Sequence, residues 1–311
     1  MAYGSCSPPS GRNSGQNLEA SQSTNPLYRD IPLEAEDAGQ VLPSSVKRAV
    51  GRRASARVRR VDVGGLMMSP LDLSGSLARL EALLQDGQQH YVAFCDSNLF
   101  VHVRENPDIL PIINGASMVL ADGVALVLLS KLLRRPLPAR VPGPAFIDAA
   151  CEFGLSRGWR HFFYGGAEDV APRLADALQR KYPGLRVAGT YTPPFRALDE
   201  AEERQVKARI EEAQPHLLWV GLGGPKQELW MAGHMGRIDV PVMLGVGAAF
   251  DFHSGNRRWA PVWVRKAGME WAYRALTGGK RVFWRNLRCV PMAAMLIAGD
   301  VSRAAIGRED Q

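Results

Sequence analysis

The most regular feature of the chain is a series of short apolar runs, each followed by a polar or glycine-rich turn. Amphipathic segments with helical spacing lie between them, such as residues 170–182 and 199–214. The runs have the length of buried strands and occupy residues 90–98, 116–123, 160–166, 185–194, 216–225 and 240–252. Strands that alternate with helices predict a mostly parallel α/β sheet, and ligands of such sheets bind at the carboxyl ends of the strands.

Both ends of the chain differ from this central pattern. Residues 1–60 are rich in Ser, Gly, Pro, Asn and Gln and end in a basic run, which predicts a disordered tail. The run suits a solvated arm or an anionic-lipid contact, and less well a nucleic-acid contact, since no aromatic residues are interleaved with it. After Pro261, Arg and Lys mix with aromatic and aliphatic residues, as in helices that lie on a membrane surface. We therefore expect a tail (1–60), an α/β core (61–260) and a basic, amphipathic helical appendage (261–311).

Composition excludes some classes of protein. With 46% hydrophobic and 22% charged residues the chain suits an ordinary globular core, and its net charge of +7 suits a polyanionic partner, whether nucleic acid, phosphorylated substrate or anionic membrane. Its four cysteines form no CxxC motif, so neither a disulfide framework nor a thiolate zinc site is expected. No signal peptide is evident, and no apolar stretch approaches the roughly 18 residues that cross a bilayer.

Two strand ends carry residues with chemical potential. Asp122 stands at a turn before an apolar helix, where a carboxylate could remove a proton or merely cap the helix. Gly221, Gly223 and Gly224 could bring backbone amides towards a diphosphate while Lys226 supplies charge, or could form a plain tight turn.

A third strand end carries Asp251, whose carboxylate could bind ribose hydroxyls or an amide edge. Motifs for several other sites are missing from residues 61–260: the glycine-rich segment fits neither the GxGxxG fingerprint nor a P-loop, and there is no DxD motif. His253 stands without a second histidine or an acidic pair at metal-ligand spacing, so no metal site is predicted.

The succession of motifs resembles one enzyme family. In order, the chain contains DSN, ADG, RVPG, GLGGPKQE, GVGAAFD and APVWVRKAGMEWAYR. Over about residues 63–290 their order and spacing are similar to those of the WecG/TagA/CpsF family, glycosyltransferase family 26, whose members build linkage units of exopolysaccharide, wall teichoic acid and enterobacterial common antigen. The resemblance implies a Rossmann-like core of the type called GT-E, with a C-terminal helical appendage that docks on the membrane.

The resemblance also implies a reaction: inverting transfer from a UDP-sugar to a polyprenyl-diphosphate-linked sugar, without metal or other cofactor. Asp122 matches the family's proposed base, which would deprotonate the acceptor hydroxyl as it attacks the anomeric carbon opposite UDP. Asn98 matches the Asn of a Thr-x-Asn element and would orient donor or acceptor, and Arg140 matches an arginine that could pair with a diphosphate or fix Asp122. The chain departs from the family at Asp96, where Thr is frequent, and at Ala145, where Asp is expected, so the identity of the transferred sugar is not determined by the resemblance.

Other matching positions concern the donor. Lys226, Gln227 and Glu228 match a PKQE loop that would line the nucleotide pocket with Gly221 and Gly223. Asp251 matches a carboxylate proposed to contact the nucleoside. In the family, arginines of the appendage cover the site and stabilise the departing diphosphate, a task that falls to cations where no metal is present. The candidates here are Arg274, Arg281 and Arg285, with Arg288 next.

The expected partners are a UDP-sugar donor, a polyprenyl-diphosphate-sugar acceptor and the anionic inner face of the cytoplasmic membrane, on which the enzyme would lie as a peripheral cytoplasmic protein. Nucleic acid is not expected, and a homo-oligomer stays open because apolar surface of the appendage could meet either lipid or a second subunit. UDP-glucose, UDP-N-acetylmannosamine and a UDP-uronic acid all suit the family.

Two rival functions come from the same features. Glycine-rich strand ends also occur in nucleotide-sugar or NAD-dependent oxidoreductases, although the chain lacks both GxGxxG and a Tyr-x-x-x-Lys pair. The basic ends suit a non-enzymatic scaffold for lipid or nucleic acid.

Overall fold

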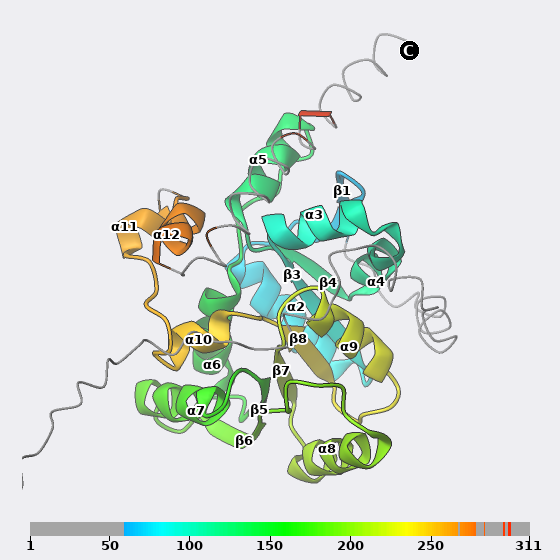
Figure 1. Cartoon of the computed structure of the whole chain (residues 1–311), viewed down its shortest axis with the longest axis vertical. Helices are drawn as coiled ribbons and strands as arrows, with labels where there is room; N and C mark the ends of the chain where they lie inside the picture. Colours follow the sequence, from blue (N-terminus) through cyan, green and yellow to red (C-terminus); the bar gives the residue numbers. More distant parts are fainter. Residues whose placement is uncertain (1–58, 267, 278–282, 284–294, 296–297, 300–311) are drawn as a thin grey trace, which may run out of the picture.

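The computed structural model describes residues 59–266, 268–277, 283, 295 and 298–299 (Figure 1). Its centre is a six-stranded sheet with the order β4-β3-β8-β7-β5-β6, in which every pair of neighbours is parallel. The strands are β3 (His90–Cys95), β4 (Met118–Ala121), β5 (Arg160–Gly165), β6 (Arg186–Tyr191), β7 (Leu217–Gly221) and β8 (Val242–Gly245). A separate antiparallel hairpin consists of β1 (Val61–Val63) and β2 (Leu66–Met68). The predicted α/β fold class is confirmed.

Helices cover both faces of the sheet and divide the core into two clusters of buried side chains. Because successive strand residues point to opposite faces, β3 contributes Tyr91, Ala93 and Cys95 to one cluster and Val92 and Phe94 to the other. The first cluster lies under α3 (Ser97–Glu105), η2 (Pro107–Ile109), α4 (Leu110–Gly115), α5 (Val124–Leu132), α8 (Glu200–Ala213) and α9 (Lys226–His234). The second lies under α2 (Leu73–Gln85), α6 (Gly143–Gly154), α7 (Val170–Lys181) and α10 (Ala249–His253).

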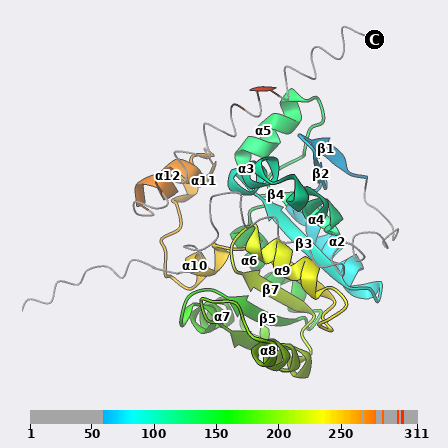
Figure 2. The same ribbon diagram turned by 45° about the vertical axis from the view of Figure 1, so that its right-hand side comes forward.

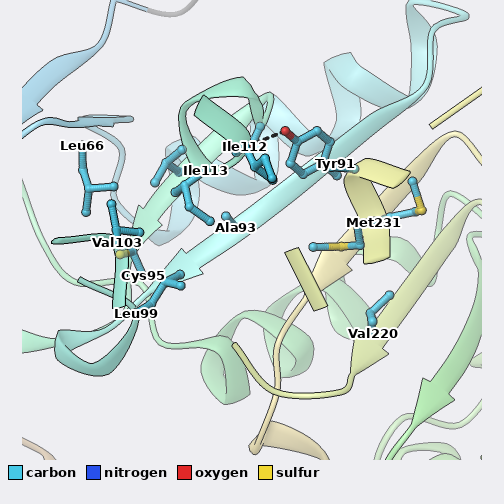
Figure 3. Close-up of a cluster of buried hydrophobic side chains, with 14 of the residues drawn as sticks. Leu66, Tyr91, Ala93, Cys95, Leu99, Val103, Ile112, Ile113, Val220 and Met231 are labelled. Atoms are coloured by element: carbon cyan, nitrogen blue, oxygen red, sulfur yellow. Dashed lines mark hydrogen bonds between the residues drawn. The ribbon is translucent and has the colours of Figure 1, made fainter. Parts of the chain in front are cut away.

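One polar group inside the first cluster is satisfied by the backbone. The hydroxyl of Tyr91 donates to the carbonyl of Ile112 at 2.5 Å, which fixes α4 against β3 (Figure 3). Cys95 ends the same strand and faces Leu99 of α3 (Figure 3), so the apolar packing continues to the edge where β3 stops.

The apolar runs predicted as strands form β3 to β8, and the two amphipathic segments form α7 and α8. The start of α8 has a capping box, in which Asp199 accepts from the amide of Glu202 and Glu202 accepts from that of Asp199. One prediction was wrong in detail: β6 is not a buried strand. It pairs with β5 alone at the edge of the sheet, which leaves its residues partly exposed.

Two short helices, α11 (Val262–Lys266) and α12 (Glu270–Thr277), lie side by side outside the sheet, after an extended segment that follows α10 (Figures 1 and 2). In the described part of the chain, no helix combines the length and the apolar character that a bilayer crossing requires. The region boundaries at residues 60 and 260 stay predictions. Nearly all of the predicted tail, and most of the predicted appendage beyond Thr277, lie outside the described residues.

A close approach of two strands gives a test of this packing. Gly165, at the end of β5, has φ +118°, and a Cβ there would lie 2.7 Å from the carbonyl carbon of Gly221 on β7. We predict that Gly165→Ala lowers the free energy of unfolding by on the order of 3 kcal/mol, because a strained backbone adds to a clash with backbone atoms. Urea unfolding measures the loss.

The matched control is Gly87→Ala, since Gly87 has φ +69° but nothing within 4 Å of its Cβ position. Only the strain of the left-handed backbone conformation remains there, so the free energy of unfolding should fall by about 1 kcal/mol. Equal losses in the two variants would contradict the contribution of the β5–β7 contact.

Candidate active site

The carboxyl ends of the strands bring the sequence motifs to one edge of the sheet. The amide of Asp122, after β4, donates to the carbonyl of Cys95 on β3 at 2.9 Å. A Cβ on Gly123 would lie 3.5 Å from the Cα of Asp96, so the turns after β3 and β4 are in contact. Asn98, which the sequence predicts as a site residue, lies in the first turn of α3 beside them.

The two aspartates at this edge have different local roles. Asp96 is the N-cap of α3, and its carboxylate accepts from the amide of Leu99 at 2.9 Å. The N-cap of α5, in contrast, is Gly123 and not Asp122. Asp122 is therefore not the N-cap residue of α5, and its role as a base stays a prediction.

Three carboxyl groups act electrostatically on the thiol of Cys95, and we call them the carboxylate cluster: Asp96, Asp122 and Glu228. The pKa of the Cys95 thiol is raised well above its usual range, first by burial and further by the negative charges of all three. The cluster combines the ends of β3 and β4 with the first turn of α9.

Gln227 joins the loops that surround this cluster. Its side-chain Nε2 donates to the carbonyl of Gly245 on β8 at 2.7 Å and to Oε1 of Glu228 at 2.8 Å, while its Oε1 accepts from the amide of Gly223 at 3.1 Å. Both Gln227 and Glu228 are buried. Their effect on a nucleotide would therefore pass through the loop that they hold, and their predicted place in the lining of a nucleotide pocket stays a prediction.

Glu228 lies in an unfavourable environment for a charge. It is wholly buried, and its Oε2 has no hydrogen-bond partner. Burial raises the pKa of Glu228 to about 7, the charge of Asp96 adds to the rise, and the hydrogen bond from Gln227 opposes it. A protonated Glu228 is therefore common at neutral pH.

The glycines of the loop after β7 serve the fold as well as the site. A Cβ on Gly221 would lie 2.7 Å from the ring of Phe250, so this residue is required for packing. The amide of Gly223 donates to Oε1 of Gln227, so it already has a partner within the protein. Lys226 begins α9, whose N-cap Pro225 provides no side-chain hydrogen bond, so the positive end of that helix and Lys226 offer charge to an anion.

Arg140 connects the sheet edge to the C-terminal helices. Its Nη2 donates to the carbonyl of Arg265 at 2.6 Å, and its Nη1 lies 3.4 Å from Oε2 of Glu270. Gly268, between α11 and α12, lies against Val124, where a Cβ would be 3.1 Å from a methyl group. The described appendage thus contacts the helix that follows Asp122, while the predicted catalytic role of Arg140 stays a prediction.

The remaining predicted site residues are Asp251 and the arginines of the appendage. Oδ1 of Asp251 accepts from Asn256 at 2.7 Å and its Oδ2 lies 3.5 Å from Nε of Arg257, so the carboxylate closes the turn after α10. Arg274 belongs to α12, but its side chain is not among those described. The other predicted arginines lie outside the described residues: Arg281, Arg285 and Arg288. Among the described residues no group of three or more His, Cys, Asp or Glu is placed to hold a metal ion.

Comparison with known proteins decides between the functional interpretations. The model of the glycosyl transferase WecG/TagA/CpsF family matches residues 61–305. The chain belongs to this family. It is therefore a glycosyltransferase, as the motifs indicated, and neither an oxidoreductase nor a non-enzymatic scaffold.

Curated relatives come from Staphylococcus aureus. The protein of strain MRSA252 is 33% identical over 212 residues, which cover 65% of this chain and 80% of the relative. Those of strains NCTC 8325 / PS 47 and COL are 32% identical over the same coverage. Each bears the name N-acetylglucosaminyldiphosphoundecaprenol N-acetyl-beta-D-mannosaminyltransferase.

Some contacts that shape the glycosyltransferase site cannot be recognised from local sequence patterns. Glu270 lies in a motif that was recognised, but its pairing with Arg140 spans 130 positions and has no local pattern. The convergence on Cys95 was missed for the same reason, since its three carboxyl groups come from separate segments.

The burial of Glu228 predicts a pH-dependent stability. Its pKa is about 7 in the folded enzyme against an ordinary 4.5, so the folded state retains a proton that the unfolded state releases. The wild type therefore loses stability as the pH rises from about 4.5 to 7, by on the order of 3 kcal/mol. Glu228→Gln, which cannot ionise, should gain stability relative to the wild type across this window, as measured by urea unfolding at several pH values.

Glu212→Gln on the exposed face of α8 is the control and should follow the wild type. Parallel pH curves for Glu228→Gln and the wild type would show that Glu228 ionises without cost.

Proposed function

We propose that the enzyme transfers a hexose or N-acetylhexosamine, with inversion and without a metal, from a UDP-sugar to a polyprenyl-diphosphate-linked sugar in the biosynthesis of exopolysaccharide or another cell-surface polysaccharide. The observation that supports this most is family membership together with the position of Asp122 at the edge where β3 and β4 end. The relatives' names specify a diphosphoundecaprenol acceptor and a β-linked product.

In the proposed step, Asp122 takes the proton of the acceptor hydroxyl while the hydroxyl oxygen attacks the anomeric carbon of the donor sugar. The bond from that carbon to the diphosphate breaks, and UDP leaves with the electron pair. Nucleotide sugars of this kind carry an α-linked diphosphate, so a β product follows from one displacement with inversion. Asn98, in the first turn of α3, would orient one of the two sugars.

The charge that develops on the departing UDP needs cations. Lys226 and the positive end of α9 would supply part of the compensating positive charge. Asp251, in α10, would contact the nucleoside. Arg140 holds the start of the appendage against the strand ends, which favours a site completed by Arg274 and by Arg281 and Arg285.

The partner surface that we propose is the anionic inner face of the cytoplasmic membrane. Most of the exposed large apolar side chains in the described part of the chain belong to α5 or to the α11–α12 segment: Leu128, Leu132, Val262, Trp263, Met269, Trp271 and Leu276. Lys131 and Arg134 are exposed beside the leucines. Both views place these helices away from α7 and α8 (Figures 1 and 2). Apolar side chains between cations suit anionic lipid, where the acceptor is anchored.

The base is tested by Asp122→Asn in the full chain, assayed as UDP release from UDP-glucose, UDP-N-acetylmannosamine and a UDP-uronic acid with a short-chain polyprenyl-diphosphate sugar. We expect acceptor-dependent release to fall by roughly 100-fold to 10,000-fold, because the amide cannot accept the proton. Release by the wild type should persist in EDTA. Asp176→Asn, on the exposed side of α7, should retain activity.

Two results would overturn the proposal. Loss of wild-type release in EDTA would show that a metal is required, and full activity of Asp122→Asn would remove the assigned base.

The membrane surface is tested by replacing Leu128 and Leu132 together with glutamine. Co-sedimentation with phosphatidylglycerol-containing vesicles should weaken by at least about tenfold, because two half-exposed leucines no longer enter the lipid. Activity on a short-chain, soluble acceptor should remain. Leu155→Gln, an exposed leucine at the end of α6, is the control and should bind vesicles as the wild type does.

The same variants distinguish lipid from a second subunit. If vesicle binding is unchanged but the mass in solution falls from dimer to monomer, this surface is a subunit interface instead.

A further inference from the structure

The wholly buried Glu228 has a position that its packing does not explain. Its Oε2 has no hydrogen-bond partner and lies 3.3 Å from where a Cβ of Gly224 would be, directly beneath the loop after β7. It belongs to the first turn of α9, two residues after Lys226. A hydrophobic side chain would fill this space without an unpaired polar atom, so a function specific to a carboxyl group is indicated.

The charges around Glu228 are mostly of its own sign. Helix α9 packs chiefly against α4, β3, β7 and β8, and the residues of α4, β7 and β8 contain no titratable side chain, whereas β3 carries Tyr91 and Tyr164 of β5 stacks on Trp230 of α9. The charge of Asp96 acts on Glu228 directly, Asp122 and Glu228 both act on the thiol of Cys95, and Lys226 and His234 belong to α9 itself. An ionised Glu228 would therefore add a third negative charge to the edge that has to receive the diphosphate of the donor.

We infer that Glu228 is a positioning residue that takes up a proton when the donor binds, so that the loop above it accepts the diphosphate without a buried negative charge beneath. This inference rests on the proposed UDP-sugar donor. The hydrogen bonds of Gln227 connect the two events, because the side chain that donates to Glu228 also accepts from the amide of Gly223 in the loop.

Proton uptake follows from reciprocity between two ligands of one site. An anion near the start of α9 makes ionisation of Glu228 less favourable, and an ionised Glu228 weakens binding of the anion by the same factor. Because the pKa of Glu228 in the free enzyme is near 7, the linkage lies within an accessible pH range. Affinity should fall as the pH rises above 7, by no more than about tenfold per pH unit for one linked proton.

The experiment is calorimetric titration of UDP into the full chain between pH 6.5 and 8.5, in buffers that differ in ionisation enthalpy. The wild type should take up a fraction of a proton at pH 7.5. Glu228→Gln, which resembles the protonated form, should lose that uptake and keep at pH 8.5 the affinity that the wild type has at low pH. Protonation of UDP itself is common to both proteins and cancels in the difference. Glu212→Gln should behave as the wild type.

A second variant separates this role from a merely structural one. Asp96→Asn removes the charge that helps to raise the pKa of Glu228, so the pH midpoint of proton uptake should move down while uptake itself persists. Equal proton uptake by Glu228→Gln and the wild type would overturn the inference and leave the proposed donor intact. Failure of UDP to bind the wild type at any pH would overturn the proposed donor and the inference together.

Discussion

The side-chain amide of Gln227 is the contact on which the geometry of the site depends. Parallel strands bring several loops to one edge of a sheet, but they do not fix those loops relative to one another. Gln227 does so by binding the end of β8, the loop after β7 and Glu228 at once. Since all three partner groups are buried or partly buried, water could not readily supply these hydrogen bonds in place of Gln227.

The same edge concentrates negative charge that does not stabilise the fold. Asp96 offsets part of its cost as the cap of α3, whereas Glu228 receives one hydrogen bond from Gln227 at Oε1 and its Oε2 has no partner. Unfavourable groups of this kind typically occur where chemistry or binding requires them. In the proposed reaction donor and acceptor both carry diphosphates, so control of the local charge would be as important as the base itself.

The fold could be predicted from sequence because its signals are local. Runs such as residues 216–225 show their length, their apolar character and their terminal glycines without reference to the rest of the chain. The order of the strands could not be predicted in this way, since β8 pairs not only with β7, the strand before it in the chain, but also with the distant β3, where His90 lies opposite Val242. For the site, the motifs identified the right strand ends, but they did not reveal that Gly223 binds Gln227, that Glu228 is buried or that Arg140 contacts Glu270. Each of these depends on tertiary contacts.

Helix α5 connects chemistry and location in the proposed reaction. Asp122 stands two residues before it, and its exposed leucines lie further along the same helix, which is about 12 Å long from first to last Cα. In the acceptor, a single diphosphate joins the sugar that reacts to the lipid that anchors it. A base at one end of a short helix and an apolar surface along it have the separation that such a molecule requires. Because Gly268 packs against Val124, the described start of the appendage and α5 would meet the membrane together, and binding to lipid would place Asp122 within reach of the acceptor hydroxyl.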